Sequence, residues 1–260
     1  MLVKKCKNLL KIIFYKFVNI FKPTTSEFSK KIKNNNYDKF KKNGKYPPGI
    51  QGDGHILWIE NSVKDFSNLL VQQCSPKIIL DIGSLNGIES VFLADIFPEA
   101  RIFAFEANPE AYKITKNITN EIENITLYNF AVSDVDKIGN FFVTPNMGTS
   151  SMLQPIGGPA GEEFEEISTK FIRIDTWAIK NKIQTIDAVW MDVQGAEEAV
   201  LSGFGSLLSG VKVLKTEIGK KAYYKNHSLK DSILPYLDGM NPFKINSESM
   251  WEDDIIFVRK

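Results

Sequence analysis

The sequence predicts an α/β protein whose core is a doubly wound, mostly parallel β-sheet. Between residues 78 and 218, short apolar runs rich in Ile, Val and Phe alternate with amphipathic segments of about ten to fifteen residues. The 260 residues are 43% hydrophobic and 12% aromatic, which is enough apolar surface for one large core. Because strands that alternate with helices pair in parallel, we expect helices on both faces of the sheet.

The first half of this alternation is regular. The run "IILDI" predicts a buried strand, and "GSLNG" predicts a glycine-containing turn directly after it. The helix that follows stops before Pro98, because proline cannot continue a helix. The expected elements are, in order, a helix over 58–73, a strand over 78–82, the turn 83–87, a helix over 88–97, a strand over 101–107, a helix over 108–118 and a third strand over 125–133.

The second half is less regular. The stretch from 147 to 163 is rich in glycine and proline and is expected to be a loop. The last two apolar runs are expected to form an antiparallel pair at the C-terminal end. The expected elements are strands over 139–144, 171–175, 187–193 and 211–218, helices over 176–182, 197–208 and 231–237, and the terminal pair 244–249 and 253–259.

The N-terminal arm differs in charge from the rest of the chain. Residues 1–45 contain 13 lysines and two acids, a net charge of +11, whereas residues 46–260 carry −10. Apolar residues recur at helical spacing over 1–22 with lysines on another side, which is typical of a basic amphipathic helix. We therefore expect an arm of helix and linker over 1–45 and a main domain over 46–260.

The sequence alone does not decide the role of this helix. Lys11 and Lys16 interrupt its apolar run, so neither a signal peptide nor a membrane-spanning helix is expected. The helix could lie peripherally on an anionic membrane, pack on its own domain, or join a second subunit in a homo-oligomer. Nucleic acid is not an expected partner, because the arm lacks arginine and the body is acidic. Cys6 and Cys74 form no motif, which favours a reducing, cytoplasmic compartment.

The candidate binding residues come directly after predicted strands. In a doubly wound sheet, ligands bind outside the carboxyl ends of the strands. Small residues after the first strand let a ligand approach the backbone at a helix N-terminus. Glu106 ends the second strand, 19 residues past Gly87, where a carboxylate can accept hydrogen bonds from both hydroxyls of a ribose. The candidates for a nucleoside cofactor are Asp81, Gly83, Ser84, Asn86, Gly87, Glu106, Ala131, Val132 and Ser133.

The glycine turn favours one cofactor over two others. "GSLNG" lacks the third glycine of the dinucleotide fingerprint and the lysine of a Walker motif, which disfavours NAD and ATP. Asp81 would repel a pyrophosphate but suits a cationic sulfonium. The balance favours S-adenosylmethionine, although a ribose-binding Glu106 does not by itself separate this cofactor from NAD.

Six segments of the chain resemble a known family. "ILDIGSLNGIESVFLA", "FAFEANPEAYKITKNI", "LYNFAVSD", "RIDTW", "VWMDVQGAEEAVLSGF" and "KTEI" resemble, in this order and at similar spacing, the FkbM-type methyltransferases. The resemblance covers about residues 77–259, and "DVQGAE" followed by "VLSGF" is its most specific part. It implies a class I methyltransferase (Rossmann-like) fold, S-adenosylmethionine as donor, and a hydroxyl acceptor, commonly on a sugar of a glycan or of a glycosylated natural product.

The resemblance also implies roles for single residues. Gln194 stands where many relatives have glutamate, which weakens any assignment of a base to this position. The sequence also differs from many relatives over Ser84, Leu85 and Asn86, but this difference is mild. The resemblance places Asp81, Gly83, Ser84 and Gly87 at the methionine end of the donor, Glu106 at its ribose, and Ala131, Val132 and Ser133 beside its adenine.

Methyl transfer to a hydroxyl needs a group that removes the hydroxyl proton. Asp192 stands where the hydroxyl should arrive, and Glu217 lies at the next strand end. Either is a candidate general base, and together they could hold a divalent cation such as Mg²⁺. Two carboxylates make a sparse metal site, to which Asp134 is only a weak candidate addition. His227, in a loop beyond Glu217, is an alternative base or a solvated loop residue.

Other residues have both structural and functional interpretations. Glu197 and Glu198 lie in the first turn of a predicted helix, where acids favour the helix dipole, and we interpret them as structural. His55 precedes the first helix of the body and could belong to a segment that covers the substrate. Four aromatic side chains could stack on a sugar or pack in the core: Trp190, Tyr223, Tyr224 and Trp251.

The sequence therefore predicts an S-adenosylmethionine-dependent O-methyltransferase that acts on a hydroxyl of a sugar. Two alternatives remain open. The acceptor could be a small metabolite or an amine, or the chain could be a catalytically silent cofactor-binding module that recruits partners through its basic N-terminal helix.

Overall fold

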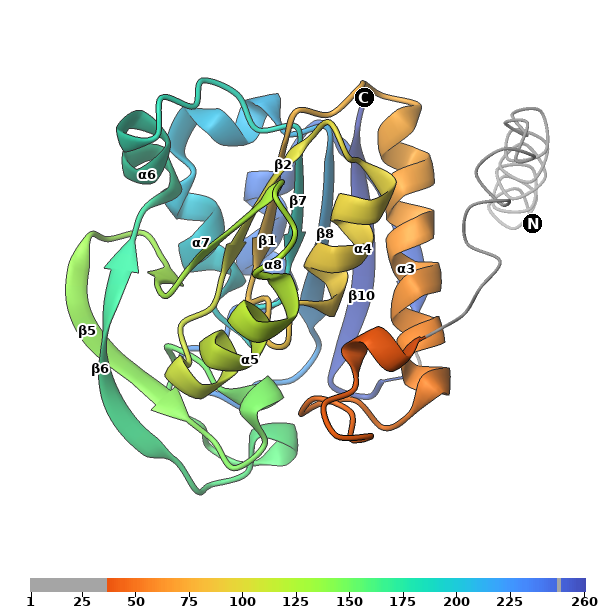
Figure 1. Ribbon diagram of the computed structural model, residues 1–260. Coiled ribbons are helices and arrows are strands. Elements are labelled where there is room, and N and C mark those ends of the chain that lie inside the picture. The colour runs from red at the N-terminus through yellow and green to blue at the C-terminus, as the bar shows by residue number, and fades with distance from the viewer. Residues whose placement is uncertain (1–36, 247–248) are drawn as a thin grey trace, which may run out of the picture. The chain divides into compact units, whose positions relative to one another are not determined.

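The computed structural model describes residues 37–246 and 249–260 (Figure 1). The expected helix over 1–22 lies outside the described residues. The chain divides into two compact units, residues 1–39 and residues 40–260. The expected arm and domain, 1–45 and 46–260, place this boundary six residues later. The fold below is that of the larger unit.

A seven-stranded sheet forms the centre of this unit, with the strand order β3-β2-β1-β7-β8-β10-β9. Neighbouring strands pair in parallel from β3 to β8, and β10 is antiparallel to both of its neighbours. The expected doubly wound sheet with an antiparallel C-terminal strand is therefore confirmed. The strands are β1 (Ile78–Ile82), β2 (Arg101–Phe105), β3 (Ile125–Tyr128), β7 (Ala188–Met191), β8 (Val213–Gly219), β9 (Met240–Asn246) and β10 (Glu252–Arg259).

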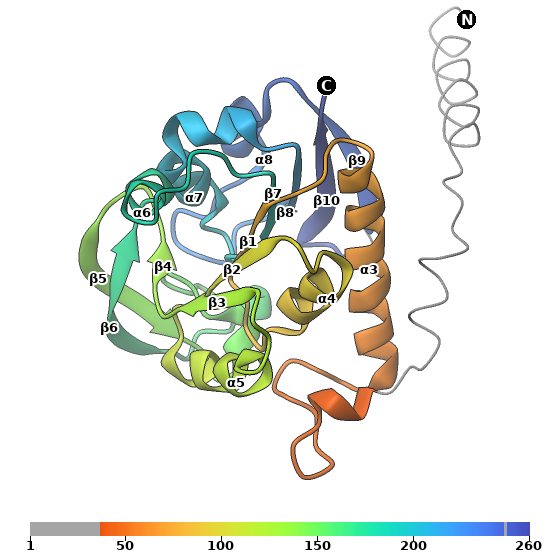
Figure 2. The same ribbon diagram turned by 45° about the horizontal axis from the view of Figure 1, so that its top comes forward.

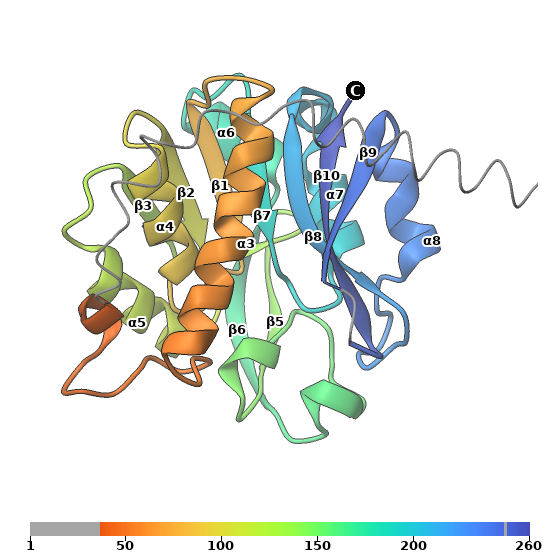
Figure 3. The ribbon, with the colours of Figure 1, turned by 90° about the vertical axis from the view of Figure 1, so that its right-hand side faces the viewer.

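Helices cover both faces of the sheet, and α3 crosses one face in Figure 3. On that face Phe66 of α3 packs edge-on against Trp190 of β7, with ring centroids 5.4 Å apart. The other face holds the main apolar core, to which the second set of helices contributes Trp177, Val200 and Ile233. The first set is α3 (Asp53–Val71), α4 (Ile88–Ile96) and α5 (Pro109–Thr119), and the second is α6 (Ile174–Lys180), α7 (Glu197–Gly203) and α8 (Lys230–Ile233).

Trp177 is the largest side chain of the main core and is 1% exposed. Its ring lies edge-on to Phe103 and Phe105 of β2, with centroids 4.9 and 5.2 Å apart. Burial of each such side chain stabilises the fold by about 1.5–3 kcal/mol, and the edge-to-face geometry adds to it. This packing fixes the carboxyl end of β2, which carries Glu106.

A second sheet of three strands has the order β4-β6-β5. Its strands are β4 (Ala131–Val132), β5 (Lys137–Val143) and β6 (Glu165–Ile172), and Figure 2 shows β5 and β6 as a ribbon at the left of the main sheet. The expected single strand over 125–133 is therefore wrong. The Asn129 side chain donates hydrogen bonds to the carbonyls of Glu106 and Ala107, and this turns the chain out of the main sheet between β3 and β4.

Two helix predictions differ from the structure by five residues at one end. The helix expected over 58–73 begins at Asp53, and the helix expected over 197–208 stops at Gly203. Gly205 has a left-handed φ of 54°, which an α-helix cannot accommodate, and the chain continues as a 3₁₀ helix over Gly205–Gly210. In the described part of the chain, no helix combines the length and the apolar character that crossing a membrane requires.

Gly203 of α7 packs against the chain directly after β4. A Cβ atom at this position would lie 2.1 Å from the backbone carbonyl oxygen of Ser133. We expect Gly203→Ala to lower the free energy of unfolding by about 2 kcal/mol or more, because backbone atoms must move. Gly210→Ala is the matched control, since a Cβ there meets no atom within 4 Å. Urea unfolding of both variants measures the difference, and equal stabilities would contradict this contact.

Candidate functional site

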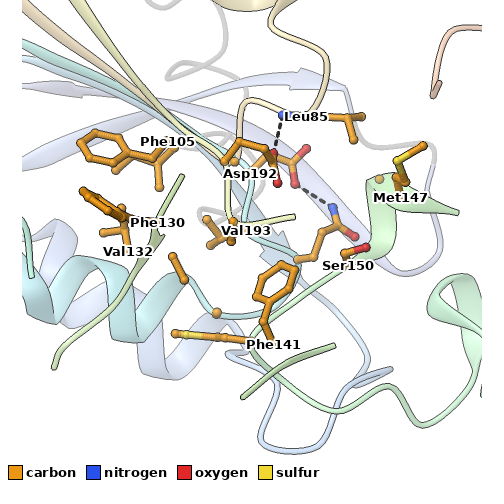
Figure 4. A pocket seen from close by; sticks show the side chains of 18 residues that line it. Leu85, Phe105, Phe130, Val132, Phe141, Met147, Ser150, Asp192 and Val193 are labelled. Atoms are coloured by element: carbon orange, nitrogen blue, oxygen red, sulfur yellow. Dashed lines mark hydrogen bonds between the residues drawn. The ribbon is translucent and has the colours of Figure 1, made fainter. Parts of the chain in front are cut away.

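One pocket lies at the carboxyl ends of β1, β2 and β7 (Figure 4). It encloses about 610 Å³ of empty space, part of it open to solvent. Carboxylates and an amide line one part of the pocket, and aromatic and aliphatic side chains line another. The lining residues are Ile82, Gly83, Leu85, Phe105, Glu106, Ala107, Phe130, Ala131, Val132, Phe141, Met147, Gly148, Ser150, Met152, Asp192, Val193, Gln194 and Ala196.

The turn after β1 approaches the end of β7 very closely. Gly83 has a φ of 85°, and a Cβ atom there would lie 1.8 Å from the carbonyl oxygen of Asp192. The Asp192 N–H in turn donates a hydrogen bond to the Ile82 carbonyl at 2.9 Å. Only glycine fits at position 83, because any other residue would push these two backbone segments apart.

Four residues predicted to bind the cofactor support this turn and are not among the pocket-lining residues. The buried Asp81 carboxylate accepts a hydrogen bond from the Ser90 hydroxyl. Asn86 accepts from the Ile88 N–H and donates to the Pro48 carbonyl. The buried residues Ser84 and Gly87 complete the turn: the Ser84 N–H donates to the Phe105 carbonyl, and Gly87 packs against Thr115 and Thr119.

Glu106 follows β2, lines the pocket and is 7% exposed. Its carboxylate accepts the Leu85 N–H at 2.7 Å through Oε2 and the Asn108 N–H at 2.8 Å through Oε1. Burial raises the pKa of this carboxyl to about 7, and the backbone hydrogen bonds oppose the rise. Each carboxylate oxygen has two acceptor positions, so both can also accept a hydroxyl of a ligand.

The apolar part of the pocket comes from the second sheet and the chain that leads into it. Figure 4 shows Phe105, Phe130 and Val132 on one side of the space, with Phe141 below them. Ala131, which the sequence predicted to bind the cofactor, lines the pocket with its neighbours Phe130 and Val132. Ser133 does not line it: its hydroxyl donates to Asp134 at 3.0 Å.

A loop that the sequence did not predict as part of the site closes another side of the pocket. Met147, Gly148, Ser150 and Met152 line the pocket from this loop. The buried hydroxyl of Tyr224 donates to the Thr149 carbonyl at 2.6 Å, across 75 residues of sequence, and holds the loop in place. The glycine and serine content of 147–152 predicts only a loop, so no sequence signal indicated this contact.

Asp192 lines the pocket directly after β7, and Gln194 lies beside it. The Gln194 Nε2 atom donates to Asp192 Oδ1 at 2.7 Å and to Glu217 Oε2 at 3.3 Å. The structure thus brings together the two acids that the sequence singled out, through an amide that joins them. Glu217 is not among the pocket-lining residues, and burial and the nearby charge of Asp192 raise its pKa well above the usual range.

His227 lies close to this group but is poorly placed to act as a base. Its Nδ1 atom accepts the Tyr223 N–H at 3.3 Å, and burial lowers the pKa of the imidazole to about 4. A neutral imidazole has one lone pair for hydrogen bonding, so the remaining nitrogen, Nε2, carries the hydrogen and is a donor. His227 and His55 are both outside the set of residues that line the pocket.

Three of the four candidate sugar-stacking residues are core residues. Trp190, Tyr223 and Tyr224 are at most 5% exposed, so their ring faces are covered by protein. Trp251 is half-buried, packs edge-on against Tyr223 with centroids 5.8 Å apart, and has the Lys221 ammonium 5.5 Å from its ring centroid. Trp251 is therefore the one of the four that retains accessible surface for an acceptor.

The metal interpretation gains no support from the side-chain arrangement. Within residues 37–246 and 249–260, no group of three or more His, Cys, Asp or Glu side chains is placed to hold a metal ion. Asp134, the weak third candidate, is exposed, accepts the Ser133 hydroxyl and is not a pocket-lining residue.

A family model described as the methyltransferase FkbM domain matches residues 81–242, more than half of the chain. The chain belongs to the FkbM methyltransferase family. It is therefore an S-adenosylmethionine-dependent methyltransferase, and its strand order with an antiparallel β10 is the class I arrangement that the sequence predicted. The matched region contains Glu106, Asp192 and Glu217.

The chain is also similar to individual methyltransferases. It is 27% identical over 181 residues to the 2-O-methyltransferase NoeI of Sinorhizobium fredii, which covers 65% of this chain and 73% of that protein. Among solved structures, a putative O-methyltransferase from Klebsiella pneumoniae matches with a TM-score of 0.46 at 10% identity, covering 96% and 97% of the two chains. Magnesium protoporphyrin IX methyltransferase from Synechocystis PCC 6803 with bound S-adenosylmethionine matches with a TM-score of 0.45 at 13% identity, covering 86% and 91%.

Glu197 of this methyltransferase is buried directly behind the pocket residue Ala196. It is 1% exposed, and its Oε1 accepts the Gly195 N–H at 3.1 Å. In the part of the chain that the structure describes, no hydrogen-bond partner faces its Oε2. Burial raises the pKa of this carboxyl to about 8, so the protonated form prevails at neutral pH.

This burial predicts a pH-dependent stability. The pKa of this carboxyl is higher in the folded protein than in the unfolded chain. Its full contribution to stability is therefore present below the unfolded pKa, and it is lost as the pH rises through about 8. We expect Glu197→Gln to remove a slope of up to about 1.4 kcal/mol per pH unit between about pH 5 and 8. Urea unfolding at four pH values measures the slope, with the adjacent, less buried Glu198→Gln as control. Identical slopes for wild type and Glu197→Gln would contradict the assignment.

Proposed function

We propose that this methyltransferase transfers a methyl group from S-adenosylmethionine to a sugar hydroxyl, with Asp192 as the general base. The observation that supports this most is that Glu106 and Asp192, from opposite sides of the β1–β7 junction, line one pocket. A donor held by one carboxylate and an acceptor held by the other would meet in the same space.

The pocket residues fit the two ends of a nucleoside. Glu106 has free acceptor positions for the ribose hydroxyls, and Phe130, Ala131 and Val132 offer apolar contact to the adenine. Gly83 leaves the backbone of the turn open to close approach. When bound, the cofactor would supply a methyl group on an already activated sulfonium.

Asp192 would then have to remove one proton. As the acceptor oxygen forms its bond to the methyl carbon, the carbon–sulfur bond breaks and the hydroxyl proton passes to Asp192 Oδ2. The products are a methyl ether, the neutral thioether of the spent cofactor and a protonated Asp192. General-base catalysis of this kind contributes about 10²–10⁴-fold to the rate when the geometry is right.

A sugar is the acceptor class that we favour. The relative of known activity is named a 2-O-methyltransferase, and a hydroxyl needs the base that Asp192 provides. Trp251 offers a partly exposed aromatic face beside the Tyr223–Tyr224 pair, and Tyr224 lies 3.4 Å from the Gln194 amide oxygen. Aromatic faces of this kind stack on the apolar faces of sugar rings.

The acceptor class is tested by methyl transfer from radiolabelled S-adenosylmethionine to a panel of mono- and oligosaccharides and of small amines. We expect label in saccharides, as methyl ethers that NMR assigns to one hydroxyl position. Label confined to amines would overturn the sugar assignment. Binding of S-adenosylmethionine without transfer to any member of the panel would favour the silent binding module.

The roles of the two pocket carboxylates are tested by a pair of variants that control for each other. Asp192→Asn should lower kcat by about 10²–10⁴-fold with donor affinity retained, because the base is lost. Glu106→Gln should instead weaken donor affinity by about tenfold or more, because the amide offers one acceptor oxygen instead of two. Calorimetry with S-adenosylhomocysteine and steady-state kinetics separate the two effects. Unchanged kcat in Asp192→Asn would place the base elsewhere.

A further inference from the structure

The Gln194 side chain occupies the space between the two candidate catalytic acids. One nitrogen atom, Nε2, lies 2.7 Å from Asp192 Oδ1 and 3.3 Å from Glu217 Oε2. An amide NH₂ group carries two hydrogens, so this single nitrogen can donate one hydrogen bond to each carboxyl group. The amide therefore links the end of β7 to the end of β8.

The backbone around Gln194 is held in an unusual conformation. Its φ is 53°, in the left-handed region that residues with a side chain rarely adopt. The Ser151 hydroxyl donates to the Gln194 carbonyl at 2.9 Å, and the next N–H, of Gly195, is held by buried Glu197. The turn is thus fixed from both sides, and this conformation points the Gln194 side chain at the acids.

The orientation of the amide follows from its neighbours. Its nitrogen faces the two acids, and its oxygen lies 3.4 Å from the Tyr224 hydroxyl. The reversed amide would place its oxygen against carboxyl oxygens, which is repulsive. The one hydrogen of the Tyr224 hydroxyl is donated to the Thr149 carbonyl at 2.6 Å, so the two acids set the orientation of the amide.

The surroundings of Asp192 are strongly acidic. Lys215 is a cation that interacts with Asp192, and it forms an ion pair with Asp254 at 2.7 Å. The carboxylates of Asp254, Asp192 and Glu217 outweigh burial and raise the pKa of the Lys215 ammonium. Titratable groups whose pKa values the charge of Asp192 shifts include Asp81, Glu89, Glu106, Glu197, Lys215, Glu217, Tyr224 and Glu252.

We propose that Gln194 is a positioning residue whose amide takes the place between Asp192 and Glu217 that a bridging cation would otherwise need, so that methyl transfer here requires no metal. This inference rests on the proposed role of Asp192 as the base. By holding Oδ1, the amide directs Oδ2 toward the acceptor hydroxyl. The uncharged amide holds Asp192 without adding a charge beside the cationic S-adenosylmethionine.

Gln194→Met tests the positioning role, because methionine has a similar length and cannot donate a hydrogen bond. We expect kcat to fall about 10–100-fold, in the range found when the partners of site residues are removed. The KM for the best acceptor of the saccharide panel and the affinity for S-adenosylhomocysteine should change less than threefold. A kcat equal to that of wild type would overturn the proposal, as would a loss confined to KM.

Gln194→Glu tests the second part of the proposal. A third carboxylate at this point would create a cluster of oxygen ligands suited to a hard divalent cation. We expect Mn²⁺ alone to bind this full-length variant at micromolar to millimolar concentration in calorimetry, and its kcat to drop in a chelator and recover with Mn²⁺. Wild type should bind no Mn²⁺ at this concentration and keep full activity in the chelator.

The control for the added charge is Gln154→Glu, an exposed position that should bind no Mn²⁺ and keep its kcat. Loss of wild-type activity in the chelator, or no Mn²⁺ binding by Gln194→Glu, would overturn the proposal. Asp192→Asn separates this failure from failure of the proposed function. If Asp192→Asn is inactive while Gln194→Met is fully active, the assignment of Asp192 as the base is retained and the positioning role of Gln194 is wrong. If Asp192→Asn is fully active, both the assignment of Asp192 as the base and the positioning role of Gln194 are wrong.

Discussion

The close approach of two backbone segments, at Gly83 and Asp192, sets the geometry of the whole site. β1 and β7 are neighbours in the sheet but are separated by more than a hundred residues, and the direction of strand order reverses between them. At such a switch point the turns leaving the two strands diverge and open a crevice. Because a Cβ at Gly83 would lie 1.8 Å from the Asp192 carbonyl, the turn after β1 and the turn after β7 start from backbones in contact.

The site depends next on side chains that hold backbone atoms rather than ligands. Glu106 accepts the Leu85 and Asn108 N–H groups, Asn129 donates to the Glu106 carbonyl, and Tyr224 donates to the Thr149 carbonyl. Apart from the local bond between Glu106 and the Asn108 N–H, each of these bonds joins segments that are more than twenty residues apart in the sequence. Glu106 is thus a structural and a candidate binding residue, since the oxygens that hold the turn also face the pocket.

The sequence predicted the sheet more completely than it predicted the pocket. The ends of β1, β2 and β7 follow from local apolar runs, so the positions of Gly83, Glu106 and Asp192 at the site follow from the sequence alone. A position after a strand does not give the direction of a side chain. Asp81, Ser84, Asn86 and Ser133 were predicted to bind the cofactor from their positions after strands and, for all but Asn86, from the family resemblance. In the structure these four side chains are buried beside the pocket and do not line it.

The parts that the sequence did not predict depend on contacts between distant residues. The departure of the chain at Asn129 and the closure of the 147–152 loop by Tyr224 have no local periodicity to reveal them. The importance of Gln194 was noticed only as a departure from the related sequences. Its two hydrogen bonds depend on a left-handed turn and on the register of β7 beside β8, neither of which a single sequence indicates.

The acidity of the site raises an electrostatic problem that the structure resolves by burial. A sulfonium loses its positive charge during methyl transfer, so a dense negative field would stabilise the bound donor more than the transition state and slow the reaction. Burial raises the pKa of Asp81 and Glu106 to about 7 and that of Glu217 well above its usual range, so these groups do not all carry charge at neutral pH. The Lys215 ammonium offsets part of the negative charge that remains. If the donor binds in this pocket as proposed, the field that remains would favour the cationic donor over its neutral product and so promote exchange of one for the other after each turnover.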